Sequence, residues 1–157
     1  MRPGAAGLYG DSFDTFDQSG PHCSGRCPAG SFCETGTTVP TACGAGTYCP
    51  EGRASPLECP AGTYGANASA LSEAGCRPCE AGTYCPAGSA EPLVCPLGTH
   101  GPEPKLGECI DCAPGSYQST KGQTACVPCI PGGWCGEGAG SPEDCPGGTY
   151  SPQLGLR

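Results

Sequence analysis

The chain has 157 residues, including 28 Gly, 19 Pro and 16 Cys, and its formal net charge is −8. Leu, Ile, Val and Phe together number only 16, about a tenth of the residues, which is too few to fill an ordinary hydrophobic core. An excess of 15 acidic over 7 basic residues argues against binding to nucleic acid or anionic membranes, and no apolar run of 18 residues exists to cross a bilayer.

The cysteine content decides between a disordered chain and a disulfide-stabilised fold. Low hydrophobicity with abundant Gly and Pro is typical of disorder, but about one residue in ten being Cys is typical of a disulfide scaffold. Disulfides persist in oxidising compartments, so we expect an extracellular protein, either secreted or part of the ectodomain of a surface protein. The first ten residues contain no apolar stretch of a secretory signal, and we therefore expect the chain to be a fragment of a larger protein.

Residues 1–22 precede the periodic part of the chain. They contain the acidic string around Asp11, Asp14 and Asp17, together with Phe13 and Phe16. Calcium binding needs more oxygen ligands in a defined loop, so an acidic lead-in, or the end of a preceding domain, is the favoured interpretation.

Residues 23–157 form a tandem array of cysteine-rich modules. Eight modules are marked by a cysteine, a glycine three positions later and a ring two positions after that; the last module is incomplete. The modules start at Cys27, Cys43, Cys59, Cys79, Cys95, Cys112, Cys129 and Cys145, and their rings are Phe32, Tyr48, Tyr64, Tyr84, His100, Tyr117, Trp134 and Tyr150. Tyr9, Phe13 and Phe16 fall outside this register.

The modules occur in two lengths. A short form, C-x5-C-x2-G-x3-P-x2-C, begins at Cys27, Cys43, Cys79 and Cys129, and a long form, C-x13–16-C-x2-C, begins at Cys59, Cys95 and Cys112. The fixed glycine predicts a turn with positive φ, and the Thr or Ser and ring after it predict a short extended segment. We expect an elongated array of small disulfide-rich β-hairpin and turn modules, with no conventional core and almost no helix; Ala66–Ala74 alone has mild helical propensity.

Two cysteines per module suggest bridges inside modules. The expected pairs are Cys59–Cys76, Cys95–Cys109 and Cys112–Cys126 in the long modules, and Cys27–Cys33, Cys43–Cys49, Cys79–Cys85 and Cys129–Cys135 in the short ones. Bridges such as Cys33–Cys43 remain geometrically possible in the short modules. This scheme leaves Cys23 as the closing cysteine of an upstream module, and Cys145 with a partner expected shortly after Arg157.

The strings CPAGTYG from Cys59 and CAPGSYQSTKGQTACVPC from Cys112 to Cys129 resemble the ephrin-receptor-like cysteine-rich repeat, a family related in style to the cysteine-rich modules of tumour-necrosis-factor and growth-factor receptors. The resemblance covers the array from about Cys23 to Tyr150. It implies a spacer or a receptor ectodomain without choosing between them, because such modules serve both roles.

Other sites are weaker. Cys109, Cys112, Cys126 and Cys129 have the spacing of a four-cysteine zinc ribbon, although Cys112 and Cys129 also open ordinary modules, and His22 and His100 do not extend the set. Asn67-Ala68-Ser69 is an N-glycosylation sequon in the longest loop. No catalytic constellation, cofactor motif or redox frame is readable, and we expect no enzyme.

The favoured function is therefore an extracellular structural or spacer segment of a larger secreted or cell-surface protein. Its expected partners are neighbouring domains of the same chain or other extracellular proteins, with no cofactor, no nucleic acid and no insertion of this segment into a membrane. The alternatives are a ligand-binding fragment of a receptor ectodomain and a zinc-binding cysteine-rich protein.

Overall fold

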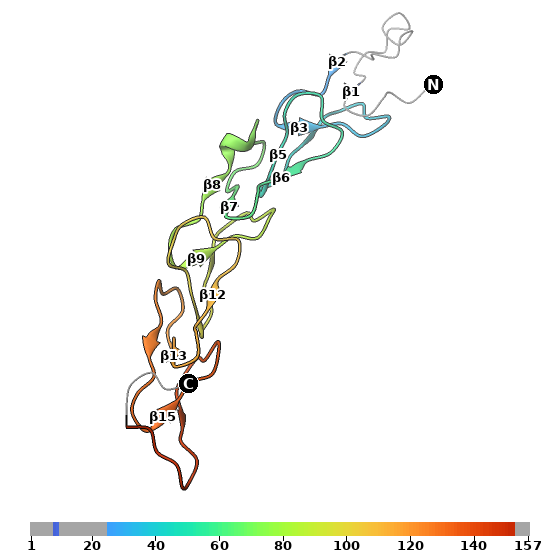
Figure 1. Ribbon diagram of the computed structural model, residues 1–157. Coiled ribbons are helices and arrows are strands. Elements are labelled where there is room, and N and C mark those ends of the chain that lie inside the picture. Colours follow the sequence, from blue (N-terminus) through green and yellow to red (C-terminus); the bar gives the residue numbers. More distant parts are fainter. Residues whose placement is uncertain (1–7, 10–24, 153–157) are drawn as a thin grey trace, which may run out of the picture. The chain divides into compact units, whose positions relative to one another are not determined.

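The structure is a computed structural model, and it describes residues 8–9 and 25–152 (Figure 1). The chain divides into two compact units, one made of Met1–Arg77 with Ala87–Glu91 and the other of Pro78–Pro86 with Pro92–Arg157. The division falls inside the module that starts at Cys79, because the loop 87–91 hydrogen-bonds to the preceding module: Gly88 N donates to Cys59 O.

Each unit consists of two-stranded antiparallel hairpins with strands of two residues. The strands are β1 Leu8–Tyr9, β2 Gly25–Arg26, β3 Ser31–Phe32, β4 Thr41–Ala42, β5 Thr47–Tyr48, β6 Leu57–Glu58, β7 Thr63–Tyr64, β8 Arg77–Pro78, β9 Thr83–Tyr84, β10 Leu93–Val94, β11 Thr99–His100, β12 Ile110–Asp111, β13 Ser116–Tyr117, β14 Val127–Pro128, β15 Gly133–Trp134 and β16 Glu143–Asp144. They pair in sequence order, β1 with β2 through β15 with β16. The predicted array of disulfide-rich hairpins is thus confirmed.

One register recurs in the hairpins. The ring of a module lies opposite the residue two positions before the next opening cysteine, as in Tyr84 opposite Leu93 and Tyr117 opposite Val127. The β1–β2 pair has the same register, because Tyr9 lies opposite Gly25, two positions before Cys27. Tyr9, which an alignment on cysteines leaves outside the repeat, therefore takes the backbone position of a module ring.

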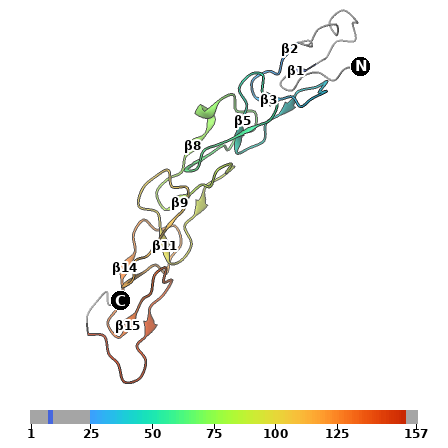
Figure 2. The ribbon, with the colours of Figure 1, turned by 45° about the vertical axis from the view of Figure 1, so that its right-hand side comes forward.

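In the described part of the chain, helical structure is limited to one turn. A 3-10 turn, η1 (Glu73–Gly75), ends the stretch Ala66–Ala74 that has helical propensity, and the rest of that stretch is loop (Figure 2). Within residues 8–9 and 25–152, no helix has the length and apolar character needed to span a bilayer.

The interior of the described chain is made of sulfur and backbone. Eleven half-cystines are 0–1% exposed, and they are the only buried hydrophobic residues among those that the structure describes. Most of the repeat glycines beside them are also buried, whereas aliphatic and aromatic side chains lie at intermediate or exposed positions. Disulfides and close backbone contacts therefore replace the side-chain core that the composition cannot supply.

Candidate functional site

Among residues 25–152 the structure has seven disulfides, each inside one module, and they join the same seven pairs that the cysteine spacing predicts. Their Cα–Cα distances range from 5.7 to 6.4 Å, within the ordinary range for disulfides. Both cysteines of each short module are buried, whereas the closing cysteines of the long modules, Cys76, Cys109 and Cys126, are partly exposed.

The repeat glycine turns the chain and binds the next module. All eight have φ between +79° and +89°, as the sequence predicts for this position. At six steps along the chain, the glycine amide donates to the carbonyl of the residue that follows the next ring. These bonds, 2.8–2.9 Å long, are Gly30–Cys49, Gly46–Gly65, Gly82–Gly101, Gly98–Gln118, Gly115–Cys135 and Gly132–Ser151.

A second position in the modules also makes backbone hydrogen bonds to the module before it. It is called the inner position here, and its residues are Gly36, Gly52, Ser69, Gly88, Lys105, Gly122 and Gly138. At six steps the amide of the inner residue donates to the carbonyl of the cysteine that opens the preceding module. The carbonyl of the residue directly after the inner residue accepts from the amide of the residue that follows the ring of the preceding module. At the step between Cys95 and Cys112, for example, Gly122 N donates to Cys95 O at 2.9 Å and Gly101 N donates to Gln123 O at 2.9 Å. Each such step therefore has a recurrent set of backbone hydrogen bonds.

The inner position requires a left-handed backbone. In five modules glycine stands there with positive φ: Gly36, Gly52, Gly88, Gly122 and Gly138. In the other two, Ser69 has φ +62° and Lys105 has φ +65°, although this region is unfavourable for side chains with a Cβ. The backbone hydrogen bonds from Ser69 N to Cys43 O and from Lys105 N to Cys79 O hold these two residues in the left-handed conformation.

The repeat glycines also allow close approach between modules that are two steps apart. A Cβ built on Gly46, Gly82 or Gly98 would collide with the carbonyl of Gly88, Gly122 or Gly138, respectively. A Cβ on Gly132 would meet nothing within 4 Å. The glycine at this position is thus required by the turn in every module and additionally by packing in some of them.

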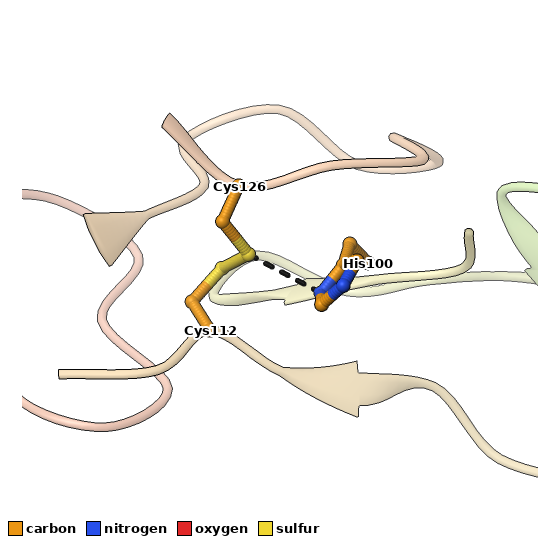
Figure 3. A group of neighbouring side chains, drawn as sticks. All are labelled: His100, Cys112 and Cys126. Carbon is orange, nitrogen blue, oxygen red and sulfur yellow. Dashed lines mark hydrogen bonds between the residues drawn. A yellow bond between two sulfur atoms is a disulfide. The ribbon is translucent and has the colours of Figure 1, made fainter. Parts of the chain in front are cut away.

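His100 is the one ring position filled by a side chain that can also bind a metal. In unit 2, its Nδ1 lies 3.0 Å from Ile110 O and 3.2 Å from Sγ of Cys126, which is bridged to Cys112 (Figure 3). A carbonyl can only accept, so Nδ1 carries the proton in this arrangement. At His100, therefore, the ring of one module contacts the disulfide of the next.

The zinc ribbon suggested by the cysteine spacing does not form in this structure. Its four cysteines belong to three different bridges: Cys109 to Cys95, Cys112 to Cys126 and Cys129 to Cys135. A disulfide sulfur is not a thiolate ligand, so the four-thiolate interpretation is corrected. The spacing misleads because the end of one long module and the start of the next reproduce C-x2-C.

The remaining candidates lie at the surface or outside the described residues. Asn67 and Ser69 of the sequon are both exposed, in the loop between β7 and η1. Cys145 is free and partly exposed in the structure. Cys23, His22 and the acidic string of Asp11, Asp14 and Asp17 lie outside the described residues.

Comparison with known families agrees with this architecture. Residues 103–145 match the family described as tyrosine-protein kinase ephrin type A/B receptor-like. The chain carries an ephrin-receptor-like cysteine-rich repeat. The matched stretch includes the string from Cys112 to Cys129 that resembles this family, together with the bridges Cys112–Cys126 and Cys129–Cys135. No curated protein is similar enough to the chain to count as a relative.

The ephrin-receptor-like match locates the chain in a general class. A disulfide-rich chain with a match of this kind fits an extracellular repeat or a segment of a receptor ectodomain. The hairpins β3–β4 and β9–β10 have the same ring register as β13–β14 in the matched stretch, and the backbone bonds described above recur at six steps among the described residues.

Proposed function

We propose that the chain is a structural spacer segment of a larger secreted or cell-surface protein. The observation that carries this proposal is the recurrence of the same backbone bonds from module to module within each unit. Bonds between main-chain groups depend little on side-chain identity, so modules of different sequence and length join in the same way. Such a design suits a part whose task is to hold neighbouring domains apart.

Disulfides suit the same task because they resist tension. Four bridges span 6 positions, two span 14 and one spans 17, so about 70 residues are excluded from the path along which the oxidised chain can be stretched. At roughly 3.4 Å per residue, and allowing for the width of the bridges, reduction releases about 200 Å of additional contour length. A spacer with intact bridges cannot unravel to that extent.

Catalysis is not part of the proposal. Of the two histidines in the sequence, only His100 lies among the described residues, and its Nδ1 donates to a backbone carbonyl. The proposed partners are neighbouring domains of the same larger chain or other extracellular proteins. The net charge of −8 supports neither nucleic acid nor an anionic membrane as a partner.

Deletion of module pairs tests the spacer directly. Fluorescent labels at the two ends of the oxidised chain report their separation by energy transfer. We expect removal of residues 79–111 and removal of residues 95–128, each two modules, to shorten that separation by similar amounts. Unequal changes, or no change, would show that module number does not determine the spacing.

A ligand-binding ectodomain segment is the second candidate, and exposed apolar side chains favour it. Trp134 is 40% exposed, and Leu97 and Ile130 are also exposed in the same unit. A receptor segment is expected to bind one extracellular protein saturably and to lose that binding in Trp134→Ala. Absence of saturable binding to the unsubstituted chain, with the module-deletion result above, favours the spacer.

A further inference from the structure

We propose that His100, Cys112 and Cys126 form a redox-gated binding site for a soft divalent metal ion such as Zn²⁺. One ligand atom from each of the three residues lies within 4.8 Å of the other two (Figure 3). The site is closed while Cys112 and Cys126 are bridged, and it forms when a dithiol reductant opens that bridge. This set differs from the zinc ribbon, because it uses one bridge and an imidazole instead of cysteines from three bridges.

The distances suit a tetrahedral site after a small side-chain movement. With metal–sulfur bonds of about 2.3 Å and metal–nitrogen bonds of about 2.0–2.1 Å, tetrahedral geometry places sulfur and nitrogen roughly 3.6 Å apart. Nδ1 of His100 is already 3.2 Å from Sγ of Cys126. The two sulfurs must separate to roughly 3.8 Å, which rotation of the two cysteine side chains can supply. The fourth position is left to water.

The backbone keeps both cysteines in place when the bridge opens. The amide of Cys112 donates to Gly98 O and its carbonyl accepts from Gly138 N, so modules on both sides hold this residue. Cys126 directly precedes β14, which pairs with β13 in the same hairpin. Cys126 is also partly exposed, so a reductant can reach its sulfur.

The reaction balances as follows. The dithiol is oxidised to its own disulfide, and its two electrons and two protons convert the bridge to two thiols. Metal binding then releases the two thiol protons to solvent. The imidazole remains neutral, and its proton moves from Nδ1 to Nε2, so the hydrogen bond to Ile110 O is given up. One such net hydrogen bond is a small loss compared with the bonds to the metal.

The chain contains its own matched comparison. The bridge Cys95–Cys109 belongs to another long module, and Tyr84 of the preceding module lines an open pocket together with Cys109. Tyr84 holds the same ring position in its module that His100 holds in the next, but a phenol is a poor ligand for a soft metal. His100→Tyr should therefore remove the site, and Tyr84→His should create a second one.

Cobalt binding to the full chain tests the proposal, since Co²⁺ reports thiolate ligands through its absorption spectrum. The chain is reduced with graded dithiothreitol, freed of reductant without air and titrated with Co²⁺, and the protected cysteines are located by alkylation and peptide mapping. We expect no binding to the oxidised chain. After partial reduction that opens the Cys112–Cys126 bridge and leaves the chain folded, we expect one Co²⁺ per chain, displaced by Zn²⁺, with Cys112 and Cys126 protected.

Two variants decide the role of the imidazole. His100→Tyr should weaken Co²⁺ binding at least about tenfold, and Tyr84→His should raise the stoichiometry from one to two. Unchanged affinity in His100→Tyr, a four-thiolate spectrum with Cys109 and Cys129 protected, or the absence of a thiolate band after reduction would each overturn the proposal. If His100→Tyr fails to form its seven bridges, Tyr84→His alone tests the role of the imidazole. A second Co²⁺ site in that variant supports the proposal, and the lack of one contradicts it.

Discussion

Replacing Gly98 by Ala tests whether close backbone packing stabilises the array. At Gly98, φ is +79°, and a Cβ there would collide with the carbonyl of Gly138, two modules further on. The left-handed backbone costs an L-residue about 1–2 kcal/mol, and forced overpacking costs about 1–3 kcal/mol more. We therefore expect Gly98→Ala to destabilise this part of unit 2 by about 2–5 kcal/mol.

Gly132→Ala is the matched control. Gly132 has nearly the same φ, +82°, but a Cβ there would meet nothing within 4 Å. Only the backbone cost of about 1–2 kcal/mol should remain. The difference between the two variants therefore isolates the close approach from the turn.

Native-state hydrogen exchange provides a local measurement in each variant. The amide of Cys112 donates to Gly98 O, and the amide of Cys145 donates to Gly132 O, so the two reporters are equivalent. A change of about 1.4 kcal/mol in local stability alters exchange tenfold. Exchange at Cys112 should rise roughly 30-fold to several thousand-fold in Gly98→Ala, against roughly 5- to 30-fold at Cys145 in Gly132→Ala. Equal effects would refute the packing argument and leave only the turn.

Three further predictions concern the bridges, the inner position and the sequon. Denatured but unreduced chain should expose at most two thiols, and full reduction should abolish dispersed amide signals in NMR, because half-cystines form the buried hydrophobic interior; signals that persisted would reveal a core without disulfides. Lys105→Gly should raise the stability of its module by up to about 1 kcal/mol in thermal unfolding, whereas Lys105→Val should lower it, because only glycine relieves a φ of +65°. Chain secreted from eukaryotic cells should carry a glycan on exposed Asn67 that Asn67→Gln removes, and an unchanged mass in that variant would contradict the sequon.

Sequence alone determined the features that depend on covalent geometry and local backbone preference. The regular return of cysteine, glycine and ring predicts the modules, their hairpins and the pairing of cysteines inside each module. A disulfide inside a module joins residues that are close along the chain, and glycine adopts positive φ readily. Both features can therefore be predicted from the identity and spacing of the residues. The composition also predicts an interior without aliphatic side chains.

Tertiary structure decided the contacts between modules. Backbone amides and carbonyls make those contacts, and every residue except proline carries both groups, so no side-chain pattern marks them. Ser69 and Lys105 consequently look like ordinary loop residues, yet they occupy the left-handed inner position that glycine fills elsewhere. Tyr9 takes a module ring's place in a hairpin that lacks the usual opening cysteine, and His100 faces the disulfide of the following module. Only the three-dimensional stacking of successive modules brings these partners together.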